Sequence, residues 1–89
     1  MSLNKEISIL IDSLKEISLP PNDLNKIKQV LEQDNGEDSI DLLELDSLGT
    51  MEFCIAIELN HNIVISPEDV FLCNKVSDLI KIIKNQIVD

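Results

Sequence analysis

The chain has few of the residues that build β-sheets and tight turns. Among its 89 residues there is no tryptophan or tyrosine, and there are only two phenylalanines, two glycines and three prolines. A sheet protein needs more turn residues and more aromatic or β-branched alternation, so we expect an aliphatic, helical core. The length fits a single domain spanning residues 1–89, and the composition predicts that this domain is all-α. Such a domain is large enough for a modest core but too small to add a deep catalytic cleft.

Motifs for metal, nucleotide and hydrolytic chemistry are also missing. Cys54 and Cys73 form no CxxC pair and have no histidine at metal-ligand spacing, so we expect buried, reduced thiols and no metal site. When Gly36 is aligned with the glycine of an EF-hand calcium loop, the aspartate that should begin the loop is missing. The sequence also has no glycine-rich phosphate loop. The single histidine, His61, lies at the far end of the helix expected after Ser47, which excludes a serine-hydrolase triad.

Segments for membrane insertion or export are absent as well. No apolar run approaches the roughly 20 residues that a membrane span requires. The N-terminus alternates charged and apolar residues instead of forming a signal peptide. We therefore expect a cytoplasmic monomer that does not insert into membranes.

Charge is distributed unevenly along the chain. The formal net charge is −10, and residues 29–74 carry eleven acidic residues without a lysine or arginine, whereas the charges of residues 1–28 cancel. Such a surface repels nucleic acid and anionic membranes and favours partners with basic patches. We interpret the acidic region as an electrostatic docking surface; a surface that serves only solubility is the alternative.

Apolar residues recur every three or four positions in several segments, which predicts amphipathic helices. The first stripe begins at Leu3 and ends before two prolines, which cannot continue a helix. Asn22 or Asp23 is expected to cap the second helix, residues 60–62 to close the third and Asn74 to cap the last. The predicted helices are residues 3–17, 24–33, 47–60, 67–72 and 76–87.

A short motif, DSLGT at residues 46–50, starts the third predicted helix. We interpret Ser47 as its N-cap, with a hydroxyl at the exposed, electropositive end where a phosphate ester would be favoured. Helical geometry divides the apolar residues that follow into two stripes. One stripe is Thr50, Phe53, Cys54 and Ile57, and the other is Leu48, Met51, Ile55 and Leu59. One stripe is enough to dock a helix on a small bundle, so the second either meets a partner or is buried by neighbouring helices.

With these neighbours, the motif resembles the phosphopantetheine attachment site of acyl carrier proteins. Its Gly-Thr pair is similar to the discrete subgroup that includes D-alanyl and peptidyl carriers, and the similarity covers residues 39–87. The resemblance implies a small acyl-carrier-like bundle of four helices. It also implies a 4'-phosphopantetheine arm, taken from coenzyme A by a phosphopantetheinyl transferase and attached to Ser47. The arm would hold acyl or aminoacyl intermediates as thioesters, and the chain itself would be no enzyme.

The resemblance also implies which residues meet partner proteins. Acyl- or aminoacyl-loading and transferring enzymes would approach the third helix with basic docking patches. By the resemblance, the recognition residues are Glu44, Asp46, Leu48, Met51, Glu52, Ile55 and Glu58. Phe53, Cys54 and Ile57 would lie in the core or line a cavity for the acyl group.

The chain departs from the carrier pattern in two places. Two helices, rather than one, precede the motif. Either the loop has acquired a helix, or residues 24–33 take the first-helix role and residues 3–17 are an extension. We describe the domain as an N-terminal helical segment, 1–36, followed by the motif loop, recognition helix, short helix and C-terminal helix in 37–89.

The second departure is a missing glycine. The family commonly has one two or three residues before the motif aspartate, where this chain has none in residues 42–45. Because this absence leaves the shape of the loop undetermined, a second interpretation stays open. In it, the chain is an unmodified carrier-like acidic module that binds a basic partner.

Overall fold

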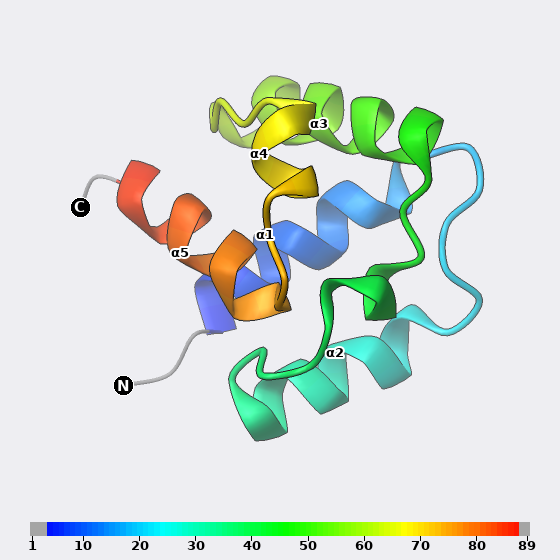
Figure 1. Cartoon of the computed structure of the whole chain (residues 1–89), viewed down its shortest axis with the longest axis vertical. Helices are drawn as coiled ribbons and strands as arrows, with labels where there is room; N and C mark the ends of the chain where they lie inside the picture. The colour runs from blue at the N-terminus through cyan, green and yellow to red at the C-terminus, as the bar shows by residue number, and fades with distance from the viewer. Residues whose placement is uncertain (1–3, 88–89) are drawn as a thin grey trace.

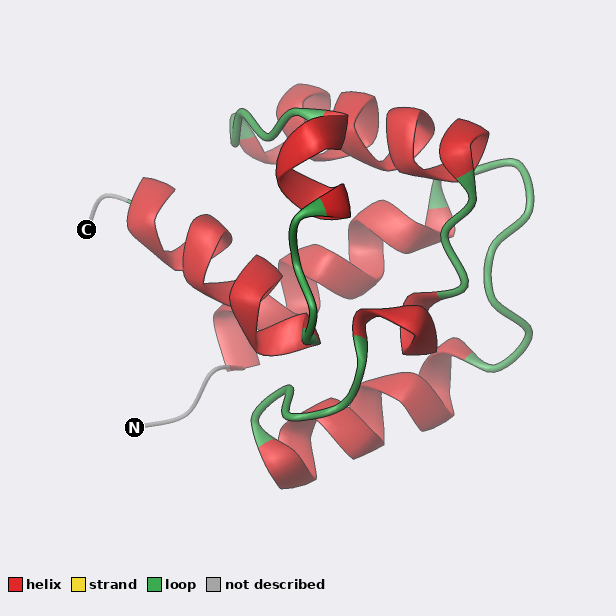
Figure 2. Ribbon diagram, in the orientation of Figure 1, coloured by secondary structure: helices red, strands yellow, loops and turns green. Residues whose placement is uncertain are grey.

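The computed structural model describes residues 4–87, which form helices joined by loops (Figures 1 and 2). The elements are α1 (Asn4–Lys15), α2 (Leu24–Asp34), a 3₁₀ helix η1 (Ile40–Leu43), α3 (Ser47–His61), α4 (Pro67–Phe71) and α5 (Val76–Gln86). The described range contains no β-strand, only an isolated bridge between Ser39 and Lys75. The predicted all-α fold is confirmed, including the additional helix before the motif. Leu3, where the first stripe was expected to begin, lies outside the described residues.

Helix α1 occupies the centre of the bundle and contacts α2, α3 and α5. In Figure 1 it runs between α3 and α2. Leu10 and Leu14 are fully buried, and Ile7, Ile11 and Ile17 are nearly so. Because burying each such side chain contributes roughly 1.5–3 kcal/mol, α1 is a main part of the core. Helix α1 is therefore an integral member of the bundle and not a peripheral appendage.

Helix α2 is the second helix that precedes the motif. It packs on α1 through Ile27 and Leu31, which are buried. Its start is fixed by Asp23, whose Oδ1 accepts a hydrogen bond from Lys26 N–H at 3.0 Å. The chain therefore forms a second helix, α2, between α1 and the motif.

Most of the predicted helix ends are confirmed. Asn62 ends α3 in the left-handed conformation, with φ 60. Ser66 caps α4 with a reciprocal hydrogen-bond pair to Asp69. The prediction for α5 is wrong, because Asn74 does not cap it. Instead the Asp78 carboxylate accepts hydrogen bonds from two backbone N–H groups that precede the helix, one of them that of Asn74.

The loop after α2 is held against the start of α5 by Gly36. Its φ is +82, and its carbonyl oxygen accepts a hydrogen bond from Ser77 N–H at 2.7 Å. A Cβ added at Gly36 would lie 2.9 Å from Ile80 Cδ1 and 2.9 Å from the Ser77 nitrogen. Only glycine fits both the backbone conformation and the space available.

We expect Gly36→Ala to lower the free energy of unfolding by about 2 kcal/mol, for two reasons. The new methyl group would clash with a backbone atom, and alanine would be strained in the left-handed conformation. Urea denaturation measures this change. Asn35→Gly is the control, since Asn35 also has positive φ, 58, and glycine relieves strain there. A Gly36→Ala protein as stable as the parent would contradict this account of the loop.

The loop between α1 and α2 is tied to α3 by two hydrogen bonds. Ser18 donates its hydroxyl to one Glu52 carboxylate oxygen at 2.6 Å and its backbone N–H to the other at 3.1 Å. These hydrogen bonds lower the pKa of the Glu52 carboxyl below its usual value, because they stabilise the charged form. The interaction joins residues that are 34 positions apart, so it fixes the loop relative to the motif.

The pH dependence of stability should report this interaction. A carboxyl whose pKa is lowered by folding stabilises the native state above its ordinary pKa, and the effect disappears as the pH falls through the lowered value. Ser18→Ala should therefore be less stable than the parent at neutral pH, and the difference should shrink below about pH 4. Ser8→Ala, at another exposed serine, should show no such trend. A constant difference across the pH range would contradict the role of Glu52.

Candidate functional site

The motif begins α3 through a cap formed by Asp46. This residue has an extended backbone, with φ −88 and ψ −174, and its Oδ1 accepts a hydrogen bond from Gly49 N–H at 2.6 Å. The prediction of Ser47 as the N-cap is therefore wrong, because the carboxylate one position earlier occupies that place. Aspartate is among the favoured caps, and its charge suits the positive end of the helix dipole.

Two further motif residues complete the helix start. A Cβ at Gly49 would lie 3.0 Å from Asp46 Oδ1, so a larger residue would crowd the cap. Thr50 is buried, and its Oγ1 donates a hydrogen bond to the Asp46 carbonyl oxygen at 2.7 Å. The residues on both sides of Ser47 thus hold the start of α3 in place, without a contribution from the Ser47 side chain.

Ser47 itself is left available for chemistry. It is the first residue of α3 and is exposed to solvent. Within residues 4–87 its hydroxyl has no hydrogen-bond partner, because the cap that it was expected to provide is made by Asp46. The partial positive charge of a helix start favours a phosphate ester at this position. The site therefore offers a fixed, reachable hydroxyl.

Glu44 replaces the glycine whose absence was noted in the sequence. It has φ 54 and ψ 37, the left-handed conformation that glycine adopts most easily. Its N–H donates a hydrogen bond to the Asp41 carbonyl oxygen at 3.0 Å, which closes η1. The neighbouring Leu43 is fully buried and anchors this turn. The loop therefore makes a left-handed turn two residues before Asp46, although no glycine is present.

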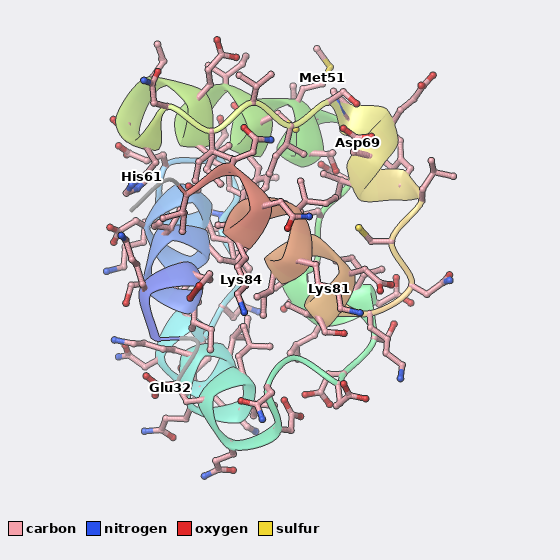
Figure 3. All side chains as sticks on the ribbon, turned by 90° about the vertical axis from the view of Figure 1, so that its left-hand side faces the viewer. Glu32, Met51, His61, Asp69, Lys81 and Lys84 are labelled. Atoms are coloured by element: carbon pink, nitrogen blue, oxygen red, sulfur yellow. The ribbon has the colours of Figure 1, made fainter. Side chains whose placement is uncertain are left out.

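The two apolar stripes of α3 have different environments. The stripe of Thr50, Phe53, Cys54 and Ile57 is buried, with none of these residues more than 7% exposed. The other stripe is solvent-exposed: Leu48 60%, Met51 52%, Ile55 56% and Leu59 79%. Met51 points away from the bundle in Figure 3. The interpretation in which neighbouring helices bury both stripes is therefore wrong, and we call the second set the exposed stripe.

Acidic residues border the exposed stripe. Glu44, Asp46 and Glu58 are exposed, whereas Glu52 is half-buried and bonded to Ser18. Glu52 thus has a structural partner that the sequence did not reveal, since nothing in the pattern indicates a contact with the loop after α1. All seven expected recognition residues lie on α3 or in the four residues that precede it.

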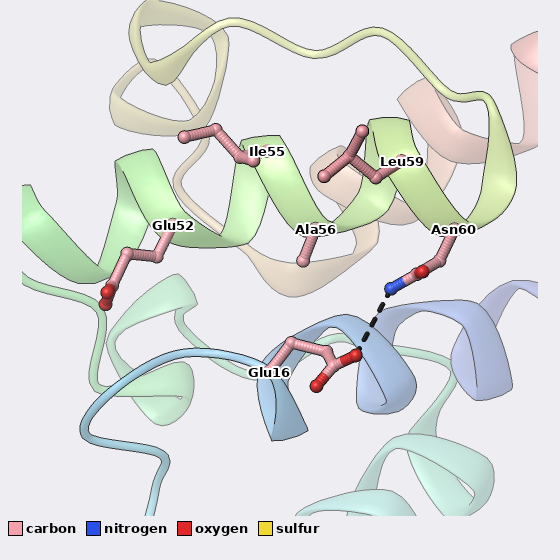
Figure 4. A pocket seen from close by; sticks show the side chains of 6 residues that line it. All are labelled: Glu16, Glu52, Ile55, Ala56, Leu59 and Asn60. Atoms are coloured by element: carbon pink, nitrogen blue, oxygen red, sulfur yellow. Dashed lines mark hydrogen bonds between the residues drawn. The ribbon is translucent and has the colours of Figure 1, made fainter.

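A groove runs between the end of α1 and α3, along the side of the exposed stripe (Figure 4). Its volume is about 430 Å³, and it is lined by Glu16, Glu52, Ile55, Ala56, Leu59 and Asn60. Asn60 Nδ2 donates a hydrogen bond to Glu16 Oε1 at 3.4 Å. Sequence analysis missed Glu16, because the charges of residues 1–28 cancel and the contact between α1 and α3 is not apparent from the sequence. The groove adds a further carboxylate beside the exposed stripe.

Other reactive side chains form no second site. Cys54 and Cys73 are free and buried, and burial raises the pKa of the Cys54 thiol to about 11 and also raises that of Cys73. His61 Nε2 lies 3.9 Å from an Asp12 oxygen and far along α3 from Ser47. In residues 4–87 no three or more His, Cys, Asp or Glu side chains are grouped to hold a metal ion. The same range contains no helix with the length and apolarity of a membrane span.

Of the two places expected for Phe53, Cys54 and Ile57, the core and the lining of an acyl cavity, the first is confirmed. Phe53, Cys54 and Ile57 belong to the core. The hollow nearest to them at the motif end has a volume of about 220 Å³ and is lined by Ile40, Asp41, Glu44, Leu45, Thr50, Val70 and Phe71. None of the three core residues is part of this lining.

Comparison with known proteins agrees with this geometry. The family described as "Phosphopantetheine attachment site" matches residues 24–83, a span that contains the whole motif and α3. No curated protein and no solved structure gives a match. The matched span starts at α2 and leaves out α1, although α1 forms the centre of the bundle. Since the match covers about two thirds of the sequence, the chain belongs to the phosphopantetheine-attachment family, whose prosthetic group is 4'-phosphopantetheine.

Proposed function

We propose that Ser47 carries the prosthetic group and that the chain is a carrier of acyl or aminoacyl intermediates, with no catalytic activity of its own. The observation that carries the proposal is the exposed Ser47 hydroxyl, which lacks a hydrogen-bond partner in residues 4–87 and stands at the first position of α3. A phosphopantetheinyl transferase would transfer the group from coenzyme A, forming a phosphodiester at Ser47 Oγ. We expect this carrier to act in the cytoplasm as a monomer.

The residues around Ser47 suit such a group. When bound, 4'-phosphopantetheine supplies a terminal thiol that holds the cargo as a thioester. Asp46 and Gly49 fix the helix start, so Ser47 is presented on a rigid element. A flexible arm on a rigid base raises the local concentration of cargo at each partner enzyme. Tethering, rather than chemistry by side chains, is therefore the role that we assign to the body of the protein.

The exposed stripe and its acidic border support transient docking. Apolar side chains such as Met51 and Ile55 supply contact area, while Glu44, Asp46 and Glu58 orient a basic partner. Charge complementarity of this kind increases the association rate and weakens as salt screens it. Partner enzymes would thus bind quickly and leave again. We assign Glu52 a mixed role, because its carboxylate also holds the loop after α1.

The left-handed turn at Glu44 favours the carrier over an unmodified module. The missing glycine was the reason to doubt the shape of the motif loop. Glu44 makes the turn despite its side chain, with φ 54. A non-glycine residue in this conformation costs roughly 1–2 kcal/mol, so the surrounding contacts of η1 hold the loop in this shape.

Attachment is tested by intact mass spectrometry. Incubation with coenzyme A and a broad-specificity phosphopantetheinyl transferase should increase the mass by one phosphopantetheine group, and Ser47→Ala should abolish the increase. Ser66→Ala is the matched control, because Ser66 is another exposed serine at a helix start. Its hydroxyl is already bonded to Asp69 N–H. An unmodified parent protein, or a modified Ser47→Ala variant, would exclude the proposed site.

Docking is tested by kinetics with the same transferase. Ile55→Ser removes apolar contact from the centre of the exposed stripe, and losing about 1.4 kcal/mol of binding would raise the KM for the carrier about tenfold. Val64→Ser is the control, because Val64 is exposed to a similar degree, 64% against 56% for Ile55, but lies outside α3. Equal KM values for the two variants would show that the stripe is not the docking surface.

A further inference from the structure

A trough begins beside Ser47 and runs toward α2, on the side of the motif away from α4. Its first part has a volume of about 290 Å³ and includes Asp46 and Leu48, the two neighbours of Ser47. Its second part has a volume of about 230 Å³ and lies between α2 and η1. Asn22 and Glu44 line both parts, so the two hollows adjoin each other.

Contacts described above shape the walls of this trough. Ser18 and Glu52 hold the loop after α1 beside the start of α3, and both residues line the first part. Asp23 caps α2 and lines the second part. The left-handed turn at Glu44 lies where the two parts meet. The trough therefore depends on the position of α2, which supplies one wall of its second part.

The lining combines apolar and hydrogen-bonding groups in both parts. Leu19, Pro20 and Leu48 provide apolar surface near Ser47, and Ile27, Val30 and Leu42 provide it at the far end. Asn22 and Lys26 supply donors, while Glu44 supplies acceptors. Leu19 and Leu48 are 78% and 60% exposed. Both leucines therefore offer apolar surface close to the motif.

The dimensions favour a long, thin ligand. Small-molecule sites usually measure roughly 300–1,000 Å³, and each part of the trough is below that range. A ligand would have to extend through both parts to be held. A linear chain with methyl groups, methylenes and two secondary amides, which is the chemistry of pantetheine, suits both the elongated shape of the trough and its mixed apolar and hydrogen-bonding lining.

We infer that the trough between the loop after α1, η1 and α2 is a resting site for the prosthetic arm, which shields its thiol between visits to partner enzymes. The inference rests on attachment at Ser47. The occupant is tethered beside the trough, so its effective concentration there is high even if each contact is weak. The hollow near Phe71 and Val70 is the competing site, but its lining does not include either neighbour of Ser47.

Nuclear magnetic resonance locates the arm without any partner enzyme. Amide chemical shifts of the unmodified and modified proteins should differ at Asn22, Lys26 and Leu42, beyond the changes next to Ser47, and should be nearly unchanged at Val70 and Phe71. Changes concentrated at Val70 and Phe71, or confined to the immediate neighbours of Ser47, would overturn the inference. Mass spectrometry of the same sample separates this result from a failure of attachment, which would remove both proposals.

Thiol alkylation with iodoacetamide gives an independent measurement. Cys54 and Cys73 are buried with raised pKa values, so at mildly alkaline pH the arm thiol should react first. Leu19→Ser and Lys26→Glu should speed alkylation of the modified protein several-fold, because both change exposed lining residues.

Leu72→Ser is the matched control, since Leu72 is 79% exposed, like Leu19, but lies outside the trough. It should leave the alkylation rate unchanged. Circular dichroism checks that each variant keeps its helices. Equal rates for the parent, Leu19→Ser and Lys26→Glu would overturn the inference while leaving attachment at Ser47 intact.

Discussion

The buried face of α1 is the constraint on which the arrangement of the other helices depends. It supplies apolar contact to α2, α3 and α5 at once, so removing it would leave those helices with little to pack against. The burial of Phe53 and Ile57 aligns α3 on this core and at the same time turns Met51 and Ile55 outward. The orientation of the exposed stripe is thus a consequence of core packing, and the position of Ser47 follows from it.

Helix periodicity was sufficient to predict the all-α fold, most helix boundaries and the exposed position of Ser47. It could not identify the N-cap of α3, because aspartate and serine are both favoured caps and occupy adjacent positions. It also missed the contact of Ser18 with Glu52 and the groove that includes Glu16. Those depend on how the loop after α1 folds back, and a loop carries no periodic signal. The turn at Glu44 escaped prediction because a left-handed glutamate is uncommon.

The acidic half of the chain has an energetic cost that is visible near the end of α2. A hydrogen bond with Asp34, together with burial and the charge of Asp34, raises the pKa of the Asp38 carboxyl. One Asp38 oxygen is buried without a hydrogen-bond partner in the described structure. More generally, like-charge repulsion within a strongly acidic chain weakens the folded state. Retaining it is consistent with a surface whose charge serves binding, the function that we propose for the border of the exposed stripe.

The burial of both cysteines has a consequence for a protein that is to carry thioesters. A thioester is attacked by thiolates, and a carrier with a reactive cysteine of its own would acylate itself and lose its cargo. The Cys54 thiol, with a pKa of about 11, is almost entirely protonated at neutral pH, and Cys73 is shifted in the same direction. The fold therefore keeps both of its own thiols buried and protonated beside the group that it would carry, and unfolding would expose them.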